Sequence, residues 1–348
     1  MSRQTMRQRD ARTPQHENRR QRFPRLREGA SRLSLDVLAR VEAASPHRPI
    51  MLREVLRTLQ PRPGDIVVDA TLGGGGHAEA LLAHIRPGGR LIGLDADSLE
   101  LPRTEARLRA AGHGPEVLAV HHGNFADLPR MLAADGLAAA NLVLADLGVS
   151  TMQHDTPARG FHFKSPGPLD MRLDPTRGET AAALLARLDE AALTALLQAN
   201  ADEPHARLIA HLLTREPVTT THALDRIVRA GLAAALPDLP RGEAKLSVRR
   251  TLQALRIAVN DEFAALERFL DVLPACLARG GRVAILTFHS GEDRRVKKAF
   301  QAAHRAGLYA SIARDVIRST KEETRANRRA SSAKLRWAVR AGAAARAR

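Results

Sequence analysis

The sequence predicts a doubly wound α/β domain that is interrupted by a mainly helical insertion. From about Ser45, short apolar runs alternate with amphipathic helices, which is the pattern of a parallel sheet covered by helices. The alternation stops over residues 156–249, where loops rich in Gly and Pro precede Ala- and Leu-rich helices, and a further strand follows. The runs predicted as strands are 66–70, 90–95, 116–120, 141–146 and 282–287.

Helices are expected between these strands and through the insertion. The predicted helices are 77–84, 98–111, 181–187, 190–198, 205–214, 224–235 and a long amphipathic one at 248–270. The simplest account is one sheet domain formed by residues 41–155 and 250–340, with the insertion 156–249 between its halves. Residues 1–40 are polar and Arg-rich and predict a disordered basic arm, and residues 341–348 form a tail.

Composition excludes several classes of protein. A chain of 348 residues that is 44% hydrophobic can bury a large core. The single cysteine, Cys276, excludes a disulfide framework and a multi-cysteine metal site, so we expect a buried side chain in a reducing compartment and no metal. No stretch approaches the roughly 18 apolar residues of a membrane span, and no apolar signal segment opens the chain. The sequence therefore predicts a cytoplasmic protein that is not bound to a membrane.

The positive charge is concentrated at the two ends of the chain. The formal net charge is +16, yet residues 1–34 carry 10 basic against 3 acidic residues and residues 314–348 carry 11 against 3. Basic ends on a nearly neutral body suit a polyanion bound through its phosphates. Tails that only keep the protein soluble are the alternative.

A glycine-rich turn follows the first predicted strand. Asp69 ends that strand and Thr-Leu-Gly-Gly-Gly-Gly-His, residues 71–77, opens the next helix, so the backbone can approach a ligand closely. The turn lacks the Lys-Ser/Thr pair of a P-loop, which argues against ATP or GTP. Asp95 ends the second strand roughly 20 residues further on, where a carboxylate can accept hydrogen bonds from ribose hydroxyls. This spacing fits a nicotinamide enzyme or a methyltransferase.

A third acid, Asp146, ends the fourth predicted strand. Ligands of open α/β sheets lie outside the carboxyl ends of the strands, so Asp69, Asp95 and Asp146 are expected to line one crevice. Each acid alone could be a strand-end cap. Three of them at three strand ends favour a binding site.

Several blocks of sequence together resemble a known family. In chain order they are DATLGGGGHAEALL, GLDAD, HGNFADL, ADLGVSTMQ, RGFHF, GPLDMRLDPTRGETAA, TLQALRIAVNDE, ILTFHSGEDRRVKKAF and VIRSTKEETRANRRASSAKLRWA. They are similar to the bacterial ribosomal RNA small subunit methyltransferase H family, also called MraW. The resemblance covers nearly all of residues 47–340.

The resemblance implies a Rossmann-like class I methyltransferase sheet, with the insertion recognising the substrate. It implies an S-adenosylmethionine-dependent enzyme that methylates the exocyclic N4 amine of one cytidine in the decoding region of small-subunit ribosomal RNA. Its partner would be that RNA or the small ribosomal subunit, and the oligomeric state, a homodimer included, stays open. The cofactor contacts carried over by position are Gly75, Gly76, His77, Asp95, Phe125, Asp146 and Gln153.

Catalysis would depend on accepting a proton from a weakly nucleophilic amine. The acceptor is either the Asp146 carboxylate or a backbone carbonyl of the turn after it. His289, at the end of the last predicted strand, is a second catalytic candidate. The target base must leave its stack, and Asp170, Arg172 and Ser290 are candidates to hold it, together with His289.

Basic side chains are expected to contact the RNA phosphates. The candidates are Arg159, Arg177, Arg249, Arg250, Arg294, Lys297 and Lys298. The chain departs from the family pattern at Pro204 and His205, at residues 246–250 and at Gly291, which puts the exact target in doubt. The alternatives are a divergent relative that methylates another RNA site or a protein, a non-catalytic RNA-binding assembly factor and, least favoured, a nicotinamide dehydrogenase.

Overall fold

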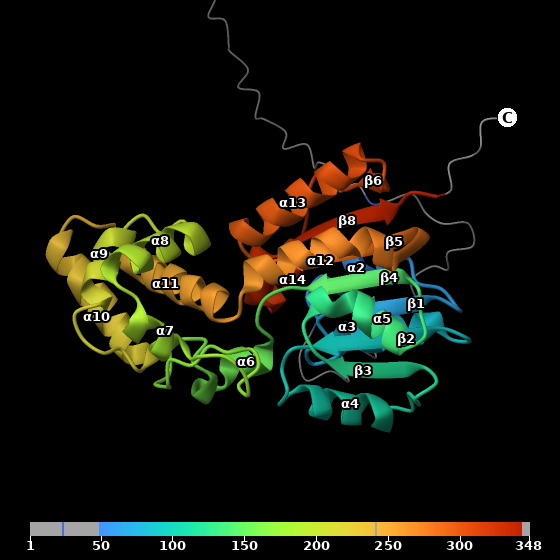
Figure 1. The fold of residues 1–348 in the computed structure, drawn as a ribbon, viewed down its shortest axis with the longest axis horizontal. Helices are drawn as coiled ribbons and strands as arrows, with labels where there is room; N and C mark the ends of the chain where they lie inside the picture. The colour runs from blue at the N-terminus through green and yellow to red at the C-terminus, as the bar shows by residue number, and fades with distance from the viewer. Residues whose placement is uncertain (1–22, 24–48, 241, 343–348) are drawn as a thin grey trace, which may run out of the picture.

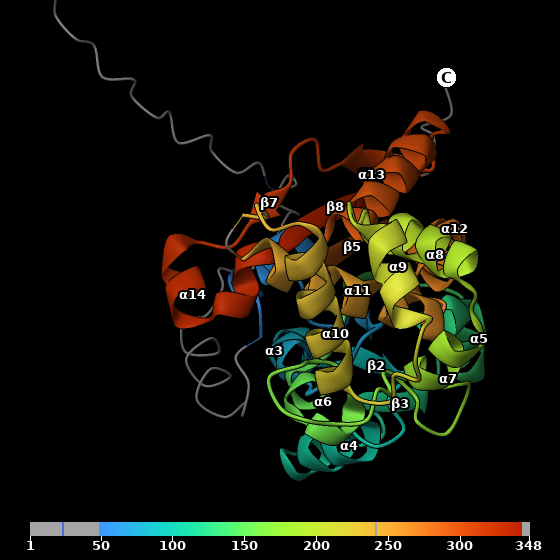
Figure 2. The same cartoon turned by 90° about the vertical axis from the view of Figure 1, so that its left-hand side faces the viewer.

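The computed structural model describes residue 23, residues 49–240 and residues 242–342. The arm predicted at residues 1–40 lies almost entirely outside the described residues, as does most of the predicted tail. Figure 1 shows a sheet with its covering helices on one side and a separate helical body, drawn in yellow and light green, on the other. The view in Figure 2 looks onto the helical body from its outer side.

The sheet has five parallel strands followed by an antiparallel extension. Its order is β3-β2-β1-β4-β5-β8-β6, and β7 also pairs with β8. Strands β1 to β5 are parallel to their neighbours, whereas β8 runs antiparallel to β5, β6 and β7. The strands are β1 (Ile66–Asp69), β2 (Arg90–Asp95), β3 (Leu118–His122), β4 (Ala140–Asp146), β5 (Leu277–Thr287), β6 (Tyr309–Ile312), β7 (Ile317–Arg318) and β8 (Lys334–Arg340).

Helices cover both faces of this sheet, as a doubly wound fold requires. Val67 and Leu142 point into one apolar cluster, and the adjacent Val68 and Val143 point into the other, because successive side chains of a strand face opposite ways. The first cluster is closed by α2 (Leu52–Leu59), α3 (Gly76–Ile85) and α4 (Leu101–Ala110). The second is closed by α5 (Leu128–Ala134), α12 (Glu262–Cys276) and α13 (Ser290–Arg305).

The insertion has an apolar core of its own. Buried side chains between Phe161 and Leu255 form a third cluster that shares no member with the two sheet clusters. Its helices are α7 (Ala181–Arg187), α8 (Glu190–Ala201), α9 (Ala206–Leu213), α10 (Thr221–Ala235) and α11 (Glu243–Val259), reached from β4 through α6 (Thr151–Asp155) and the short η2 (Pro157–Arg159). The insertion is therefore a second packing unit joined to the sheet by two connections.

The long helix predicted at 248–270 is instead two helices, α11 and α12. The chain breaks at Asn260, and Asp261 adopts a left-handed φ of 48°. The Asn260 amide donates to the Met171 carbonyl at 2.8 Å, which holds the break against the loop of the insertion. The apolar pattern continues across the break because both helices bury one face, so periodicity alone could not reveal it. Since α11 packs into the insertion core, we place the boundary of the insertion at Asn260 rather than at residue 249.

The part of the sheet after α13 was not predicted as strands. Strands β6 and β7 are short, and β8 alternates charged and apolar residues while its centre is buried. Between β7 and β8 lie α14 (Lys321–Ala326) and the 3-10 helix η3 (Arg328–Ser332). Among the described residues, no helix is both long enough and apolar enough to cross a lipid bilayer.

Candidate active site

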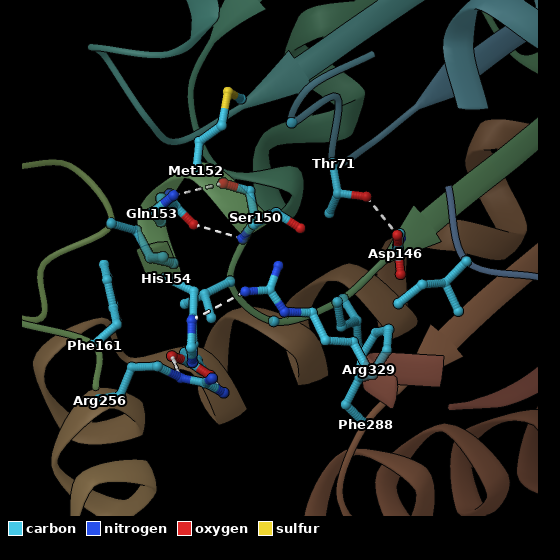
Figure 3. Close-up of a pocket in the computed structure, with 18 of the residues that line it drawn as sticks. Thr71, Asp146, Ser150, Met152, Gln153, His154, Phe161, Arg256, Phe288 and Arg329 are labelled. Carbon is cyan, nitrogen blue, oxygen red and sulfur yellow. Dashed lines mark hydrogen bonds and ion pairs between the residues drawn. The ribbon is translucent and has the colours of Figure 1, made fainter. Parts of the chain in front are cut away.

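A cleft of about 960 Å³ opens at the carboxyl ends of the parallel strands. One half is lined by the glycine-rich turn, by Asp95 and Asp146 at two strand ends, and by α6. The other half is lined by α11, by the start of α12 and α13 and by η3. Figure 3 shows the cleft between Asp146 at the end of β4, Arg256 on α11 and Arg329 on η3. The insertion and the sheet thus share one cavity.

The glycine-rich turn is fixed by side chains of α4. Gly75 has a φ of 73°, and a Cβ atom added there would lie 2.9 Å from both the Arg107 Nη2 atom and the Thr104 Cγ2 atom. Thr104 donates its hydroxyl to the Gly73 carbonyl at 2.6 Å, and Arg107 donates to the Gly74 carbonyl at 2.5 Å. Only glycine fits Gly75 without strain, because the left-handed region and the close neighbours both exclude a side chain. The turn is therefore shaped before a ligand binds.

The Asp95 carboxylate is held beside this turn. Its Oδ2 atom accepts from the Gly73 amide at 2.6 Å, and its Oδ1 atom accepts from the Asp97 amide at 2.8 Å. Burial raises the pKa of Asp95, and these two backbone hydrogen bonds oppose that shift. Each carboxylate oxygen retains acceptor capacity, so the group can still receive hydroxyl donors from the cleft.

Asp69, which is 1% exposed, and Asp146, whose side chain is 25% exposed, form an acidic pair at the ends of β1 and β4. Burial raises the pKa of Asp69 to about 7, with a smaller contribution from the nearby Asp95 charge. Burial also raises the pKa of Asp146 well above its ordinary value, and the charges of Asp69 and Glu292 add to this shift. Asp146 lines the cleft but the buried Asp69 does not, so the expectation that all three strand-end acids line one crevice was wrong for Asp69.

The Asp146 carboxyl lines the cleft and can accept a further hydrogen bond. Its Oδ1 atom is buried and has no hydrogen-bond partner among the described residues. The Asp146 amide donates to the Thr71 hydroxyl at 2.6 Å, which fixes the backbone at this point (Figure 3). A buried oxygen without a partner is costly, so a group that donates a hydrogen bond to it is expected in the working enzyme.

His77 packs against Asp146 from the first turn of α3. Its Nε2 atom lies 3.0 Å from the Ile50 carbonyl, to which it can only donate, and its Nδ1 atom lies 3.7 Å from the Asp146 Oδ2 atom. Burial lowers the pKa of His77 to about 4, so the ring is neutral near pH 7. The nitrogen that faces Asp146 is therefore the unprotonated one.

Two more residues carried over as cofactor contacts lie at the cleft in different ways. Phe125 lines it, and the Phe125 ring meets the Phe269 ring edge to face at a centroid distance of 5.2 Å. Gln153 also lines it but is only 4% exposed. The Gln153 amide accepts from the Ser150 backbone at 2.8 Å and donates to the Asp97 carboxylate at 2.7 Å. Gln153 thus holds the start of α6 in place and has its polar atoms engaged by protein groups (Figure 3).

Asp97 is the centre of a buried network that sequence reasoning missed. Its carboxylate is 1% exposed and accepts from the Arg159 guanidinium at 2.8 Å as well as from Gln153. Arg159 also donates to the backbone carbonyls of Arg172 and Leu173, at 3.0 and 2.9 Å. The prediction that Arg159 contacts phosphate was wrong, because its guanidinium is consumed in this network. The second Asp of the GLDAD block was the only sequence signal.

The structure does not bring three of the substrate candidates to the cleft. Asp170 and Arg172 form a bidentate ion pair, with both N–O distances 2.8 Å, and neither lines the cavity. Their neighbours Met171 and Leu173 line it instead. Ser290, the first residue of α13, also lies outside the lining. The motif at residues 170–172 thus lies next to the cleft, but the side chains of Asp170 and Arg172 do not line it.

His289 does line the cleft, within a polar cluster at the start of α13. Its Nδ1 atom accepts from the Glu292 amide at 3.4 Å, and its Nε2 atom lies 3.1 Å from the Glu292 Oε1 atom. Burial opposes ionisation of Glu292, but the hydrogen bond from His289 and the charge of Arg256 hold its pKa below the ordinary value. His289 therefore caps the helix and also borders the cavity.

Arg256 and Glu262 complete this cluster and were not predicted. The guanidinium of Arg256 binds both carboxylate oxygens of Glu262, at 2.8 and 2.9 Å. Ligand atoms of Glu262, His289 and Glu292 all lie within 4.8 Å of one another, a grouping that could hold a metal ion. Because Arg256 already neutralises Glu262, we interpret the cluster as a set of ion pairs.

Comparison with known proteins identifies the family to which this chain belongs. Residues 44–341 match the family model described as the MraW methylase family. The protein belongs to this family. A relative named ribosomal RNA small subunit methyltransferase H 2, from Alkaliphilus metalliredigens (strain QYMF), is 48% identical over 303 residues, which are 86% of this chain and 86% of the relative. Ribosomal RNA small subunit methyltransferase H from Anaeromyxobacter sp. (strain K) is 41% identical over 310 residues, covering 83% and 96%.

Two solved structures resemble this chain at low sequence identity. TrmN from Thermus thermophilus covers 87% of this chain and 53% of its own, with 14% identity and a TM-score of 0.41. A SAM-dependent O-methyltransferase from Thermotoga maritima covers 86% and 70%, with 9% identity and a TM-score of 0.39. The sequence relationship is the stronger result. The predicted Rossmann-like class I methyltransferase sheet with a helical insertion is confirmed by the strand order, the separate core of the insertion and the family match, and the cofactor is S-adenosylmethionine.

Proposed function

We propose that the protein transfers a methyl group from S-adenosylmethionine to the N4 amine of a cytidine in the decoding region of small-subunit ribosomal RNA. The RNA substrate is supported by the names of its relatives, and the cytidine amine by the family resemblance of its motifs. The structural observation that carries the proposal is the Asp146 carboxyl, which lines the cleft at a strand end and has one buried oxygen, Oδ1, without a hydrogen-bond partner among the described residues. Such a group is suited to accept a proton from an amine.

Residues of the first half of the cleft fit the cofactor. The turn at Gly73–Gly76 offers close backbone approach, Asp95 can receive ribose hydroxyls, and Phe125 offers an aromatic face for the adenine. S-adenosylmethionine, when bound, supplies a methyl group on a sulfonium that leaves readily as a thioether. The protein itself then has to position the amine and remove its proton.

Asp146 is the proton acceptor in this proposal. The nitrogen lone pair of cytosine is conjugated with the ring, so a carboxylate that accepts from the amine hydrogen frees electron density for the new N–C bond. With the cofactor held by the first half of the cleft, the amine nitrogen would take the methyl group from the sulfonium, which keeps the C–S bonding pair as a thioether, and Asp146 would take the amine proton. A raised pKa makes this carboxylate a stronger base, and the neutral His77 beside it adds no opposing positive charge.

The departures from the family pattern lie both away from the cleft and at it, because Arg249, within the departing run 246–250, lines the cleft. Pro204 and His205 line a shallow depression on the insertion, separate from the cleft. Gly291 lies closer, because a Cβ atom there would come within 2.6 Å of the Phe263 ring, which lines the cleft. The missing side chain at Gly291 lets Phe263 pack in this position. The cavity that would receive the base therefore keeps its polar groups.

Transfer of labelled methyl groups tests the proposal. Small ribosomal subunits that lack base methylation are incubated with the enzyme and labelled S-adenosylmethionine, and the digested RNA is analysed by mass spectrometry. We expect N4-methylcytidine, and a loss of about 10²- to 10⁴-fold in rate for Asp146→Asn with cofactor affinity retained. Asp238→Asn, exposed and outside the cleft, is the matched control and should keep the rate. Label on another base or on protein, or an active Asp146→Asn enzyme, would contradict the proposal.

A further inference from the structure

The cleft continues well beyond the part assigned to the cofactor. One face of α11 forms a wall of this second half, through Lys245, Arg249, Gln253 and Arg256. These positions lie three or four residues apart, so their side chains share one side of the helix. The basic residues of α11 that line the cleft are thus stacked along it rather than scattered.

A second basic wall comes from the C-terminal part of the chain. Arg328, Arg329 and Ser332 of η3 line the same cavity. Arg329 donates to the Asp155 carboxylate of α6 at 2.6 Å and lies 3.2 Å from the His154 ring nitrogen, which anchors η3 at the cleft (Figure 3). Basic groups from segments distant in sequence therefore border one opening.

The outer cations of this border lack carboxylate partners. Lys245, Arg249 and Arg328 are exposed, and none of them makes an ion pair within the described ranges of the chain. Lys164, in the loop of the insertion, is exposed at the same cavity and is also without an ion pair there. We call these four residues the basic rim.

Cations elsewhere on the same elements behave differently. Arg250, next to Arg249, binds the Glu243 carboxylate at 2.7 Å. Arg294 on α13 binds Asp202 at 3.2 Å. What distinguishes the rim is its position, because four cations from distant segments, unpaired among the described residues, border one cavity, and such a concentration of positive charge indicates an anionic ligand.

Aromatic side chains line the same cavity as the rim. Phe161, Phe263 and Phe288 line the cavity from three different segments. The exposed fraction of Phe161 is 8%. Cations and aromatic rings around one cavity match the two parts of a nucleotide, because phosphates bind cations and bases stack on rings. An acidic protein surface would not use the aromatic rings.

We infer that the basic rim is a phosphate clamp, in which Lys164, Lys245 and Arg249 of the insertion and Arg328 of η3 hold single-stranded RNA around a target nucleotide turned into the cleft. The inference rests on the proposed function and assigns the RNA contacts to specific residues. The insertion and η3 then act together, and neither alone grips the strand. Of the phosphate contacts expected from the sequence, only Arg249 belongs to the clamp.

Salt dependence of RNA binding tests the clamp in the intact protein. The probe is a single-stranded oligonucleotide with the decoding-region sequence, and Kd is measured from low to high salt for Lys245→Gln/Arg249→Gln and for Arg328→Gln. Each phosphate contact on a single strand contributes about 0.7 to the slope of log K against log salt. We expect the slope to fall by about 1.4 for the double variant and about 0.7 for Arg328→Gln.

Arg215→Gln/Arg226→Gln is the matched control, because it removes two exposed charges from the insertion outside the cleft. It should leave the slope unchanged, and all variants should keep the melting temperature and the cofactor Kd. Equal slopes for the rim and control variants would overturn the clamp, as would weaker methylation of subunits with unchanged RNA binding, which would indicate a protein partner. A normal rim effect without methyl transfer to cytidine by the wild-type enzyme would instead count against the proposed function.

Discussion

The two halves of the cleft satisfy their polar groups in opposite ways. In the cofactor half, Asp95 and Asp97 accept hydrogen bonds from the protein's own backbone and side chains, and α4 fixes the turn at Gly75. In the other half, Lys245 and Arg249 project from α11 without a carboxylate partner within the described residues. In the cofactor half the polar groups are paired by the protein itself. In the other half the cations remain to be paired by the ligand.

This difference corresponds to two kinds of ligand. A small cofactor of fixed shape gains affinity from a site that is already rigid, because little ordering remains to be done on binding. A flexible polyanion gains from exposed cations, which attract it over distance and release counterions. If this comparison is correct, variants in the cofactor half should affect stability and cofactor binding, while rim variants should affect only RNA binding.

The largest effect should come from breaking the buried pair between Arg159 and Asp97. The Arg159→Met variant leaves a carboxylate that is 1% exposed without its guanidinium, and we expect a loss of about 3–5 kcal/mol in the free energy of unfolding. Urea denaturation measures it.

Arg177→Met is the matched control, because Arg177 lies in the same loop, is 79% exposed and is 3.6 Å from Asp174. It should cost less than about 1 kcal/mol. Similar losses of unfolding free energy in the two variants would contradict the proposed difference between the cofactor half of the cleft, paired by the protein, and the substrate half, left open for a ligand.

The next effect should be a pH dependence of stability caused by Asp69. Its pKa is about 7 in the folded protein against an ordinary 3.8, so the folded state binds a proton that the unfolded state has released between these values. The contribution of Asp69 to stability is therefore fully present near pH 4 and is lost as the pH rises to about 7. His77, with its pKa lowered to about 4, acts in the opposite direction between pH 6.5 and 4.

The Asp69→Asn variant isolates this contribution. We expect it to match the wild type near pH 4 and to be more stable above pH 7, by on the order of 2 kcal/mol, since one pKa unit is about 1.4 kcal/mol and neighbouring acids share the shift. Denaturation curves at pH 5 and pH 8 measure the difference, and Asp127→Asn, on the exposed surface, is the control. A constant difference at both pH values would show that Asp69 is ionised throughout.

The smallest of the three effects should come from Gly75→Ala. Its left-handed φ and the 2.9 Å contacts of an added Cβ should weaken cofactor binding by about 1–2 kcal/mol, or about 5- to 30-fold in Kd. Calorimetric titration with S-adenosylmethionine measures it. Gly74→Ala is the control, because the nearest atom to its added Cβ is a Met152 methyl at 3.6 Å. Equal affinities of the two variants would mean that the turn is not shaped in advance.

The sequence predicted the cofactor half well because the signal there is local. Acids at strand ends and glycines at the following turn lie within a few residues of one another, and the topology of a parallel sheet brings the strand ends together. Thus Asp95 and Asp146 were placed correctly at the cleft. Asp69 was not, because its side chain is 1% exposed and accepts from the Thr71 amide, and residue type does not encode that burial.

The substrate half was predicted less well because its contacts are not local. Arg329 reaches a partner 174 residues earlier in the chain, at Asp155, and no pattern near either residue indicates it. Asp170 and Arg172 are two residues apart and satisfy each other, so a motif that looks like a binding element is internally neutral. Arg256 was overlooked because it lies within an amphipathic helix whose apolar residues dominate the pattern.

The separate core of the insertion also bears on how the chain folds. Strands β4 and β5 are neighbours in the sheet, yet Asp146 pairs with Leu286 across the whole insertion. Closing a long loop is entropically unfavourable, and each halving of its effective length lowers that cost by about 0.6 kcal/mol. An insertion that folds early on its local helical contacts would act as a short, rigid connector between the strands. Core substitutions in the insertion, far from the sheet, are then expected to slow the pairing that creates the methyl-transfer site.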